Sequence, residues 1–153
     1  VVLVWALVAI GTCAFTDLDD QLGDYLAYSK YNIKSERDAS KLIYEGHKKA
    51  AIWWYEGQIK QTKDKQKQAK LYLELAMYLN ALVRDNKTRY SLALKYASKA
   101  EELVHNSDSA GVLAEVYNKA NDQSNYTKYL QLSNERRSKE GKNSGDKNGV
   151  SAS

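Results

Sequence analysis

Few side chains in this sequence have the types and spacing that catalysis or metal binding requires. His47 and His105 are far apart, and the single cysteine is Cys13, so no zinc-binding spacing occurs. Glu45 and Glu56 could act as paired acids, but such carboxylates are far commoner on solvated helices. No phosphate-binding glycine loop and no serine nucleophile motif is present. The sequence therefore predicts no enzyme activity, no metal site and no cofactor, and it predicts both histidines at the surface.

Cys13 lies near the end of an apolar, uncharged opening run, residues 1–15. A helix of that length rises about 22 Å, which is too short to cross a hydrocarbon core of about 30 Å. The run matches the apolar centre of an export signal. Residues 10–13 (IGTC) resemble the lipobox of bacterial lipoproteins, which implies lipidation of Cys13 and cleavage before it. The alternatives are a truncated membrane anchor, a buried core helix and a type IV pilin-like start, in which Glu usually stands where this chain has Trp5.

The rest of the chain has a helical pattern. Proline is absent, and residues that favour helices are abundant. Apolar residues recur at steps of three and four between short polar breaks. This pattern predicts six helices, the first over residues 18–33, the second over about 36–60 and the third over 69–83, with three more between 90 and 132. We expect a helical domain over residues 16–134 and a disordered polar tail over 135–153.

The triplet YEG occurs twice within the second predicted helix, at residues 44–46 and 55–57. Eleven helical residues leave the two copies only about 20° apart, so both glycines would face the same side. A glycine inside a helix costs about 1 kcal/mol relative to alanine. We therefore expect Gly46 and Gly57 to let a neighbouring backbone approach closely.

Three bulky aromatic residues are adjacent at positions 53–55. Adjacent helical positions point about 100° apart, so the three rings cannot all enter one core. If the side of the helix that carries Ala50 is buried, Trp53 joins the core, whereas Trp54 or Tyr55 reaches a groove or a partner. The alternative is that a neighbouring helix covers the rings. Because exposed Trp and Tyr often anchor interfaces, the candidate partner-binding residues are Tyr44, Trp53, Trp54 and Tyr55.

A lysine-rich run covers residues 60–70. It could contact the phosphates of lipid or nucleic acid, but aromatic interleaving is missing and Gln separates the charges, so a solvated connection is the favoured interpretation. The net charge is only +4 because acids and bases are mixed along the chain, which makes nucleic acid an unfavoured partner. Among the functional uses, contact with an anionic membrane is favoured.

The last pair of predicted helices resembles a tetratricopeptide repeat. Residues 110–133 read AGVLAEVYNKANDQSNYTKYLQLS, with Ser133 where the family prefers Ala. Residues 75–100 are similar with a longer turn, and the segment before them matches only as a helix pair. The resemblance implies antiparallel hairpins stacked as a short solenoid, although a helical bundle would show the same small-residue spacing. The residues expected to pack within it are Gly46, Gly57, Ala76, Ala93, Ala97, Ala100, Leu113, Ala114, Tyr117, Tyr126 and Leu130.

These patterns predict a membrane-tethered scaffold of the bacterial cell envelope, on its periplasmic or surface side. The scaffold would hold another protein and serve as an accessory or assembly component of a larger complex, and a homo-oligomer is compatible with it. The alternative function is a structural subunit of a filament, pore or secretion assembly, packed through an uncleaved N-terminal helix.

Overall fold

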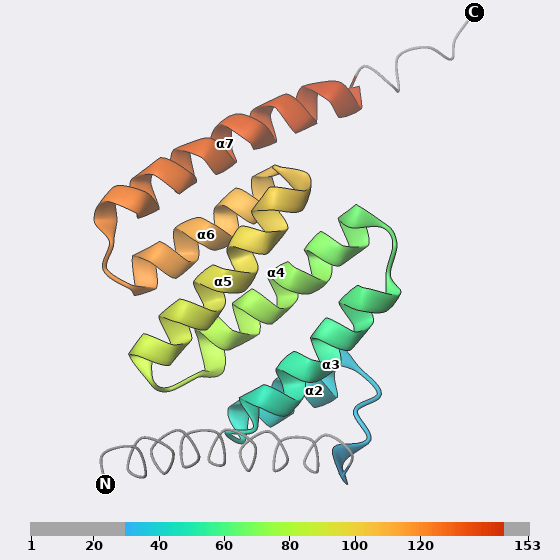
Figure 1. Ribbon diagram of the computed structural model, residues 1–153. Coiled ribbons are helices and arrows are strands. Elements are labelled where there is room, and N and C mark those ends of the chain that lie inside the picture. Colours follow the sequence, from blue (N-terminus) through green and yellow to red (C-terminus); the bar gives the residue numbers. More distant parts are fainter. Residues whose placement is uncertain (1–29, 146–153) are drawn as a thin grey trace, which may run out of the picture. The chain divides into compact units, whose positions relative to one another are not determined.

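The computed structural model describes residues 30–145, and this part of the chain contains helices and short connections but no strand (Figure 1). The prediction of an all-α protein is therefore confirmed. Its described helices are α2 (Glu36–Tyr44), α3 (Lys48–Gln61), α4 (Lys65–Leu82), α5 (Asn86–Val104), α6 (Ser107–Lys119) and α7 (Gln123–Gly145). The opening run, Cys13 and most of the helix expected over 18–33 lie outside the described residues. Among the helices that are described, none combines the length and the apolar character that crossing a bilayer demands.

The chain divides into two compact units, residues 1–54 and 55–153, with the boundary inside α3. In the first unit, Ser35 caps α2, because its side chain accepts a hydrogen bond from the Asp38 amide. The Ser35 hydroxyl also donates to the Asp38 carboxylate at 2.9 Å. The bond from the Ser35 hydroxyl lowers the pKa of the Asp38 carboxyl, and bonds from the backbone amides of Lys34 and Ser35 lower it further. The helix thus starts where its capping residues predict.

The second predicted helix is in fact two helices, because α2 ends at Tyr44 and α3 begins at Lys48. Gly46 has φ +95°, a backbone conformation that glycine adopts without steric cost. The amides of Glu45 and Gly46 bond back to the carbonyls of Lys41 and Ile43, which closes the end of α2. The prediction of one continuous helix over 36–60 was therefore wrong.

The expected role of the two glycines was also wrong. A Cβ atom placed on Gly46 or on Gly57 would meet no atom of the described residues within 4 Å, so neither position brings another backbone close. Gly46 acts instead through its backbone conformation, which allows the turn between α2 and α3. Nothing in the described contacts explains Gly57.

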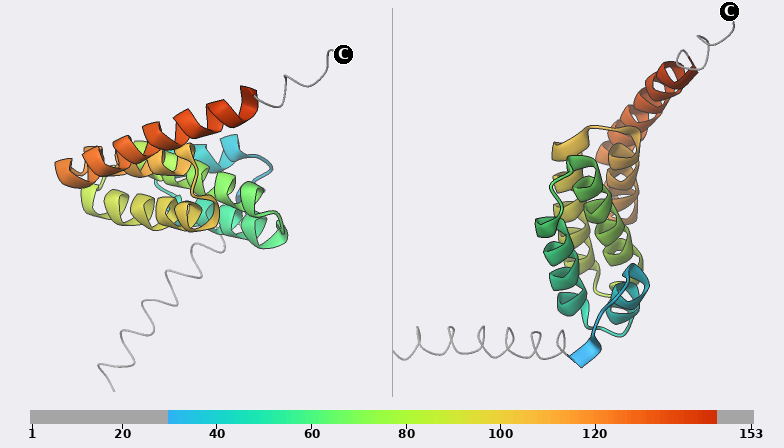
Figure 2. Two further views of the ribbon diagram at one scale, coloured as in Figure 1. Left: turned by 90° about the horizontal axis from the view of Figure 1, so that it is seen from above. Right: turned by 90° about the vertical axis from the view of Figure 1, so that its right-hand side faces the viewer.

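The second unit contains two antiparallel hairpins, α4 with α5 and α6 with α7 (Figures 1 and 2). Helix α6 also contacts both α5 and α4. Asp64, Asp85 and Asn106 cap α4, α5 and α6 with their side chains. Small side chains lie fully buried at these helix contacts, where they let the helices pack closely: Ala76, Ala93, Ala97 and Ala100, with Leu113 and Ala114 on α6.

Helix α7 continues well past the end expected from the sequence. Leu132 is its last apolar side chain, yet the helix runs to Gly145. The prediction of a disordered tail was therefore wrong over residues 135–145. The contacts that hold this polar extension are described below.

Candidate functional site

The aromatic residues singled out from the sequence do not form an exposed cluster. Tyr55 is fully buried and Trp54 is 9% exposed, whereas Trp53 is only half-buried. Trp54 and Tyr55 are therefore not surface anchors. The sequence analysis expected Trp53 in the core and Trp54 or Tyr55 outside it, and the structure shows the reverse. Tyr44, at the end of α2, is 64% exposed. Of the four candidates, only Tyr44 presents most of its ring to solvent.

Polar side chains do gather in unit 2, at the end where α5 meets α6. Arg136 of α7 donates two hydrogen bonds to the Glu101 carboxylate, at 2.8 and 2.7 Å, and a third to the Asn106 carbonyl. Glu140 lies one helical turn beyond Arg136 on α7, and its carboxylate accepts hydrogen bonds from the backbone amide and the hydroxyl of Ser107. The buried Ser133 hydroxyl donates to the Ser107 carbonyl at 2.8 Å, and the Ser109 hydroxyl donates to Glu101. We call this group the polar clasp; its members are Glu101, Ser107, Ser109, Ser133, Arg136 and Glu140.

His105 lies beside Ser109 and Glu101 of the polar clasp, but the three are not in the order that nucleophilic catalysis requires. The Ser109 hydroxyl donates to Glu101 at 2.6 Å, and His105 lies 3.4 Å from the other oxygen of the same carboxylate. A nucleophile needs the base itself as its neighbour, with the acid beyond the base. Here the carboxylate is in the middle and Ser109 is fully buried. These contacts join helices rather than activate a hydroxyl.

The electrostatics of the clasp fit a structural role. Burial raises the pKa of Glu101, but hydrogen bonds from Arg136, Ser109 and His105 outweigh burial and lower it. Bonds from Ser107 lower the pKa of Glu140. Both acids therefore stay charged at neutral pH and keep their partners.

A different kind of surface lies at the opposite end of the α6–α7 hairpin. The rings of Tyr117 and Tyr129 stack with centroids 5.4 Å apart, and Tyr90 of α5 meets Tyr117 edge-on at 6.4 Å. The ammonium group of Lys128 lies 5.5 Å from the Tyr129 ring. All three tyrosines are half-buried. We call Tyr90, Tyr117 and Tyr129 the aromatic row.

Tyr117, at the centre of the aromatic row, keeps a neutral phenol at neutral pH. Burial raises the pKa of Tyr117, and the neighbouring Tyr129, Tyr90 and Asp122 raise it further. A protonated phenol can donate a hydrogen bond while its ring packs against an apolar group. Such a side chain is suited to binding a protein surface that is partly apolar and partly polar.

A hollow of about 410 Å³ adjoins the aromatic row between the α4–α5 and α6–α7 turns. Arg89 crosses from one turn to the other, with its guanidinium donating to the Lys119 carbonyl at 3.3 Å. Asn121 adopts a left-handed conformation, φ +60°, that reverses the chain at the second turn. The hollow is lined by Asn86, Lys87, Arg89, Tyr90, Lys119, Ala120, Asn121 and Asp122.

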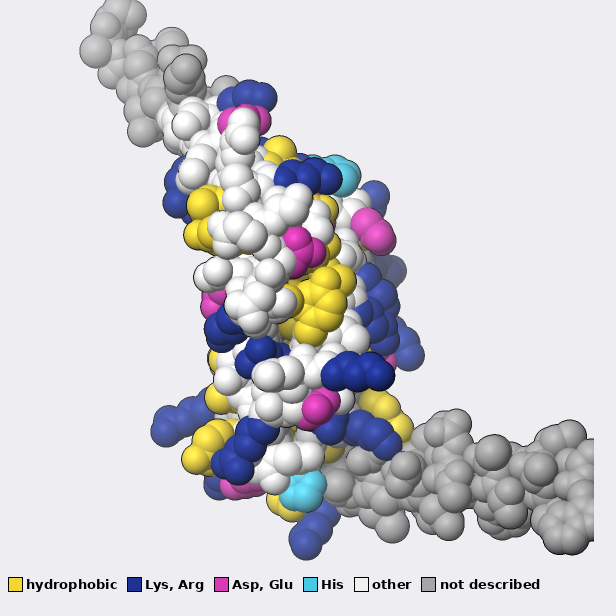
Figure 3. All heavy atoms as spheres, turned by 90° about the vertical axis from the view of Figure 1, so that its left-hand side faces the viewer, with side chains coloured by type: hydrophobic (Ala, Val, Ile, Leu, Met, Phe, Trp, Pro, Cys, Tyr) yellow, Lys and Arg dark blue, Asp and Glu magenta, His cyan; other side chains and the backbone are white. Residues whose placement is uncertain are grey.

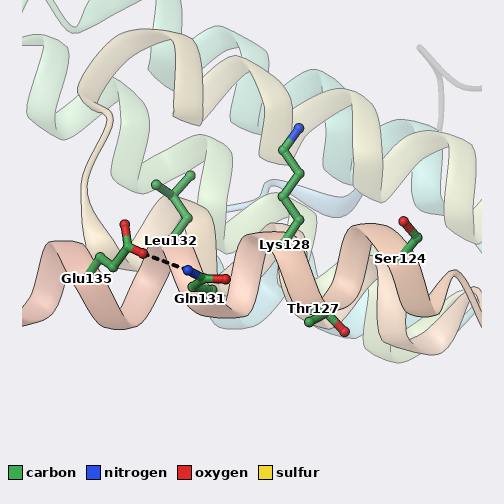
Figure 4. Close-up of a pocket in the computed structure, with 6 residues that line it drawn as sticks. All are labelled: Ser124, Thr127, Lys128, Gln131, Leu132 and Glu135. Atoms are coloured by element: carbon green, nitrogen blue, oxygen red, sulfur yellow. Dashed lines mark hydrogen bonds between the residues drawn. The ribbon is translucent and has the colours of Figure 1, made fainter.

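A larger hollow, of about 620 Å³, is a weaker candidate because a single helix lines it (Figure 4). Its six residues all project from α7, and Gln131 donates to Glu135 within the group at 2.9 Å. A ligand there would touch one helix and remain open to solvent. Binding sites usually enclose most of their ligand.

The side of the molecule drawn in Figure 3 carries hydrophobic side chains in small groups, separated by Lys and Arg. The face shown has no continuous apolar area of the kind that obligate interfaces bury.

The sequence analysis placed only part of the aromatic row. Tyr117 was expected to pack within the helical array. It packs against the rings of Tyr90 and Tyr129 and not inside the buried core. Leu130 was expected to pack too, but it is 40% exposed, so this prediction was wrong; Tyr129, one position earlier, takes the place against α6. Tyr126 is half-buried. Both histidines are exposed, as predicted.

Within residues 30–145, no group of three or more His, Cys, Asp or Glu side chains is placed to hold a metal ion. Comparisons of the sequence with protein families and with curated proteins, and of the fold with solved structures, find no match.

Proposed function

We propose that this chain is a helical scaffold that binds another protein through the aromatic row. The observation that carries the proposal is the arrangement of three half-buried tyrosines beside a hollow formed by two interhelical turns. Tyrosine is enriched among the residues that dominate binding energy, because a rigid amphipathic ring gives a large contact area at little entropic cost. Lys87, Arg89 and Lys119 around the hollow favour a partner segment that carries acidic groups.

We further propose that the hairpins form a tetratricopeptide-like array. Two observations support this reading: α6 packs against both helices of the preceding hairpin, and alanines occupy the buried crossings of α4 and α5. In such an array each hairpin leaves an apolar face that the next one covers, which creates an extended surface for a partner.

The proposed location is the membrane of a bacterial cell envelope, and its support comes from the sequence alone. The apolar opening run and the lipobox-like residues 10–13 favour a lipid tether at Cys13. Each buried CH₂ of a lipid chain contributes about 0.8 kcal/mol to membrane binding. A tether would raise the local concentration of the scaffold near its partner complex, where it would serve assembly or stabilisation.

A photo-crosslinking residue in place of Tyr90 tests the binding site in cells. We expect a discrete adduct from position 90 and none from the same residue at Gln131, which is exposed on the outer side of α7. Identical adducts from both positions, or none from either, would contradict a specific site at the aromatic row.

Intact-mass measurement of native protein tests the tether. A mature chain that starts at a diacylated Cys13 would support the lipoprotein reading. An unmodified chain that retains residues 1–12 would support the alternative function, a structural subunit packed through its N-terminal helix.

A further inference from the structure

The middle of the chain is far more basic than the whole. Residues 60–99 contain ten Lys and Arg but only three Asp and Glu, although the complete chain has a net charge of only +4. Two of the three acids, Asp64 and Asp85, use their carboxylates to cap α4 and α5. The carboxylate of the third acid, Glu74, lies 3.6 Å from the ammonium group of Lys70. The positive charges in this segment therefore outnumber the negative charges by seven.

Two of the lysines are held above a pair of stacked rings. Tyr72 of α4 and Tyr96 of α5 stack with centroids 6.1 Å apart. The ammonium of Lys99 lies 5.5 Å from the Tyr72 ring and 5.7 Å from the Tyr96 ring, and that of Lys95 lies 4.9 Å from Tyr96. These cation–π contacts keep two charges together on one side of the α4–α5 hairpin.

Helical spacing, taken with the surrounding hydrogen bonds, places two further lysines on this side. The Tyr96 hydroxyl donates to Glu56 at 2.9 Å, and Lys60 follows Glu56 by one helical turn. The Gln68 amide donates to the carbonyls of Ile59 and Thr62, so this side of α4 faces the end of α3.

Lys65 and Tyr72 lie three residues before and four residues after Gln68, on the same side of α4. The resulting surface lies wholly within unit 2. We call it the lysine face; its members are Lys60, Lys65, Lys95 and Lys99.

We propose that the lysine face binds the surface of a bilayer that contains anionic lipids. The charge complementarity is direct, because four lysines outnumber the acids beside them. These acids are Glu56, which accepts a hydrogen bond from Tyr96, and Glu102, which follows Lys99 by three residues on α5. Lys60, Lys65 and Lys95 are exposed and Lys99 is half-buried, so the ammonium groups are the outermost part of the face. A polybasic surface gains about fivefold in membrane affinity for each lysine that reaches anionic headgroups.

The chemistry of the face distinguishes a bilayer from other anionic partners. Single-stranded nucleic acid is bound by exposed rings on which bases stack. Here Tyr96 is 1% exposed and both rings carry an ammonium group, so the rings position lysines and do not offer a stacking surface. All four cations are Lys and none is Arg, whereas recognition of a single phosphate or carboxylate favours the two-pronged Arg. Point charges spread over three helices fit a diffuse negative surface.

This inference rests on the proposed membrane location, but it adds a second contact that depends on lipid charge. A lipid or apolar tether inserts into neutral and anionic bilayers alike. The lysine face would contribute only at an anionic bilayer, where it would hold unit 2 against the headgroups.

Vesicle co-sedimentation of the full chain tests the proposal. The probes are vesicles of phosphatidylcholine and vesicles of an equimolar mixture with phosphatidylglycerol. We expect tighter binding to the anionic vesicles, weakening as salt is raised. The quadruple variant with Lys60, Lys65, Lys95 and Lys99 changed to Gln should lose at least about 25-fold in affinity for anionic vesicles, which corresponds to two engaged lysines. Its affinity for neutral vesicles should not change.

A matched variant separates the lysine face from net charge. Changing Lys30, Lys34, Lys41 and Lys139 to Gln removes the same charge from exposed positions elsewhere. This variant should keep the preference for anionic vesicles, and the four lysines of the face changed to Arg should keep it as well. Circular dichroism of each variant verifies folding.

Three results would overturn the proposal. The first is an equal loss of anionic binding in the matched variant, and the second is an unmodified chain that binds anionic and neutral vesicles equally. The third is a quadruple variant that loses affinity for single-stranded RNA or polyglutamate but binds anionic vesicles as the unmodified chain does, because the bilayer would then not be the occupant. Absence of binding to neutral vesicles, with the charge preference intact, would count against the tether alone.

Discussion

The two ends of the α6–α7 hairpin are held by different physical means. At the turn end, the aromatic row packs Tyr117 between Tyr90 and Tyr129. At the open end, the polar clasp joins Arg136 and Glu140 of α7 to Glu101 and Ser107. Ring packing is broad and tolerant of small shifts, whereas a bidentate Arg–carboxylate contact requires one geometry. The hairpin thus combines an adaptable end with a strictly positioned one.

The largest expected effect comes from breaking the clasp at Arg136. Arg136→Ala removes both hydrogen bonds to Glu101 and leaves that half-buried carboxylate without its cation. We expect the free energy of unfolding to fall by about 2 to 3 kcal/mol. Urea denaturation measures this free energy. The control is Arg137→Ala, at an exposed neighbouring position, which should change the free energy of unfolding by under about 0.5 kcal/mol. Equal effects of the two substitutions would show that the clasp does not stabilise the hairpin.

A substitution in the aromatic row should lower the free energy of unfolding less than a substitution in the polar clasp. Tyr117→Leu keeps an apolar side chain of similar reach but removes two ring pairs, so the free energy of unfolding should fall by about 1 kcal/mol. The same urea titration measures it. A loss larger than that of Arg136→Ala would reverse the comparison between the two ends.

The extension of α7 should respond locally to Glu140→Gln. The substitution weakens the contacts of Glu140 with Ser107 and leaves the buried part of the hairpin intact. We expect faster hydrogen exchange of the backbone amides of residues 134–145, with little change in the melting temperature. Glu135→Gln, whose side chain bonds only within α7 in the described contacts, is the control. Unchanged exchange in the Glu140 variant would mean that other contacts hold the extension.

Acid should weaken the clasp and spare the aromatic row. The pKa values of Glu101 and Glu140 are lower in the folded chain than the ordinary value of 4.5. Their contribution is therefore fully present above that value and is lost as the pH falls through the lower folded pKa values. The difference in stability between the unmodified chain and Arg136→Ala should shrink on going from neutral pH to about pH 3, while the effect of Tyr117→Leu stays constant.

The sequence alone was sufficient to predict the helical class and the start of α2 at Glu36. Ser35 caps α2 and Asn106 caps α6 as their types and positions indicate, because a cap depends on a few consecutive residues. The buried alanines of α4 and α5 followed from periodicity for the same reason: spacing along one helix determines which side chains share a face.

Tertiary structure decided what depends on residues far apart in the chain. Arg136 lies 35 residues from Glu101, and Lys99 lies 27 residues from Tyr72, so no local pattern connects them. A polar segment such as 135–145 reads as disordered until its partners at the start of α6 are in place. Even the helix break at Gly46, where one glycine takes a left-handed conformation, contradicted the apolar period that continues on both sides of it. Periodicity reports which side of a helix is buried, but the partner that covers it is set by the packing of the whole unit.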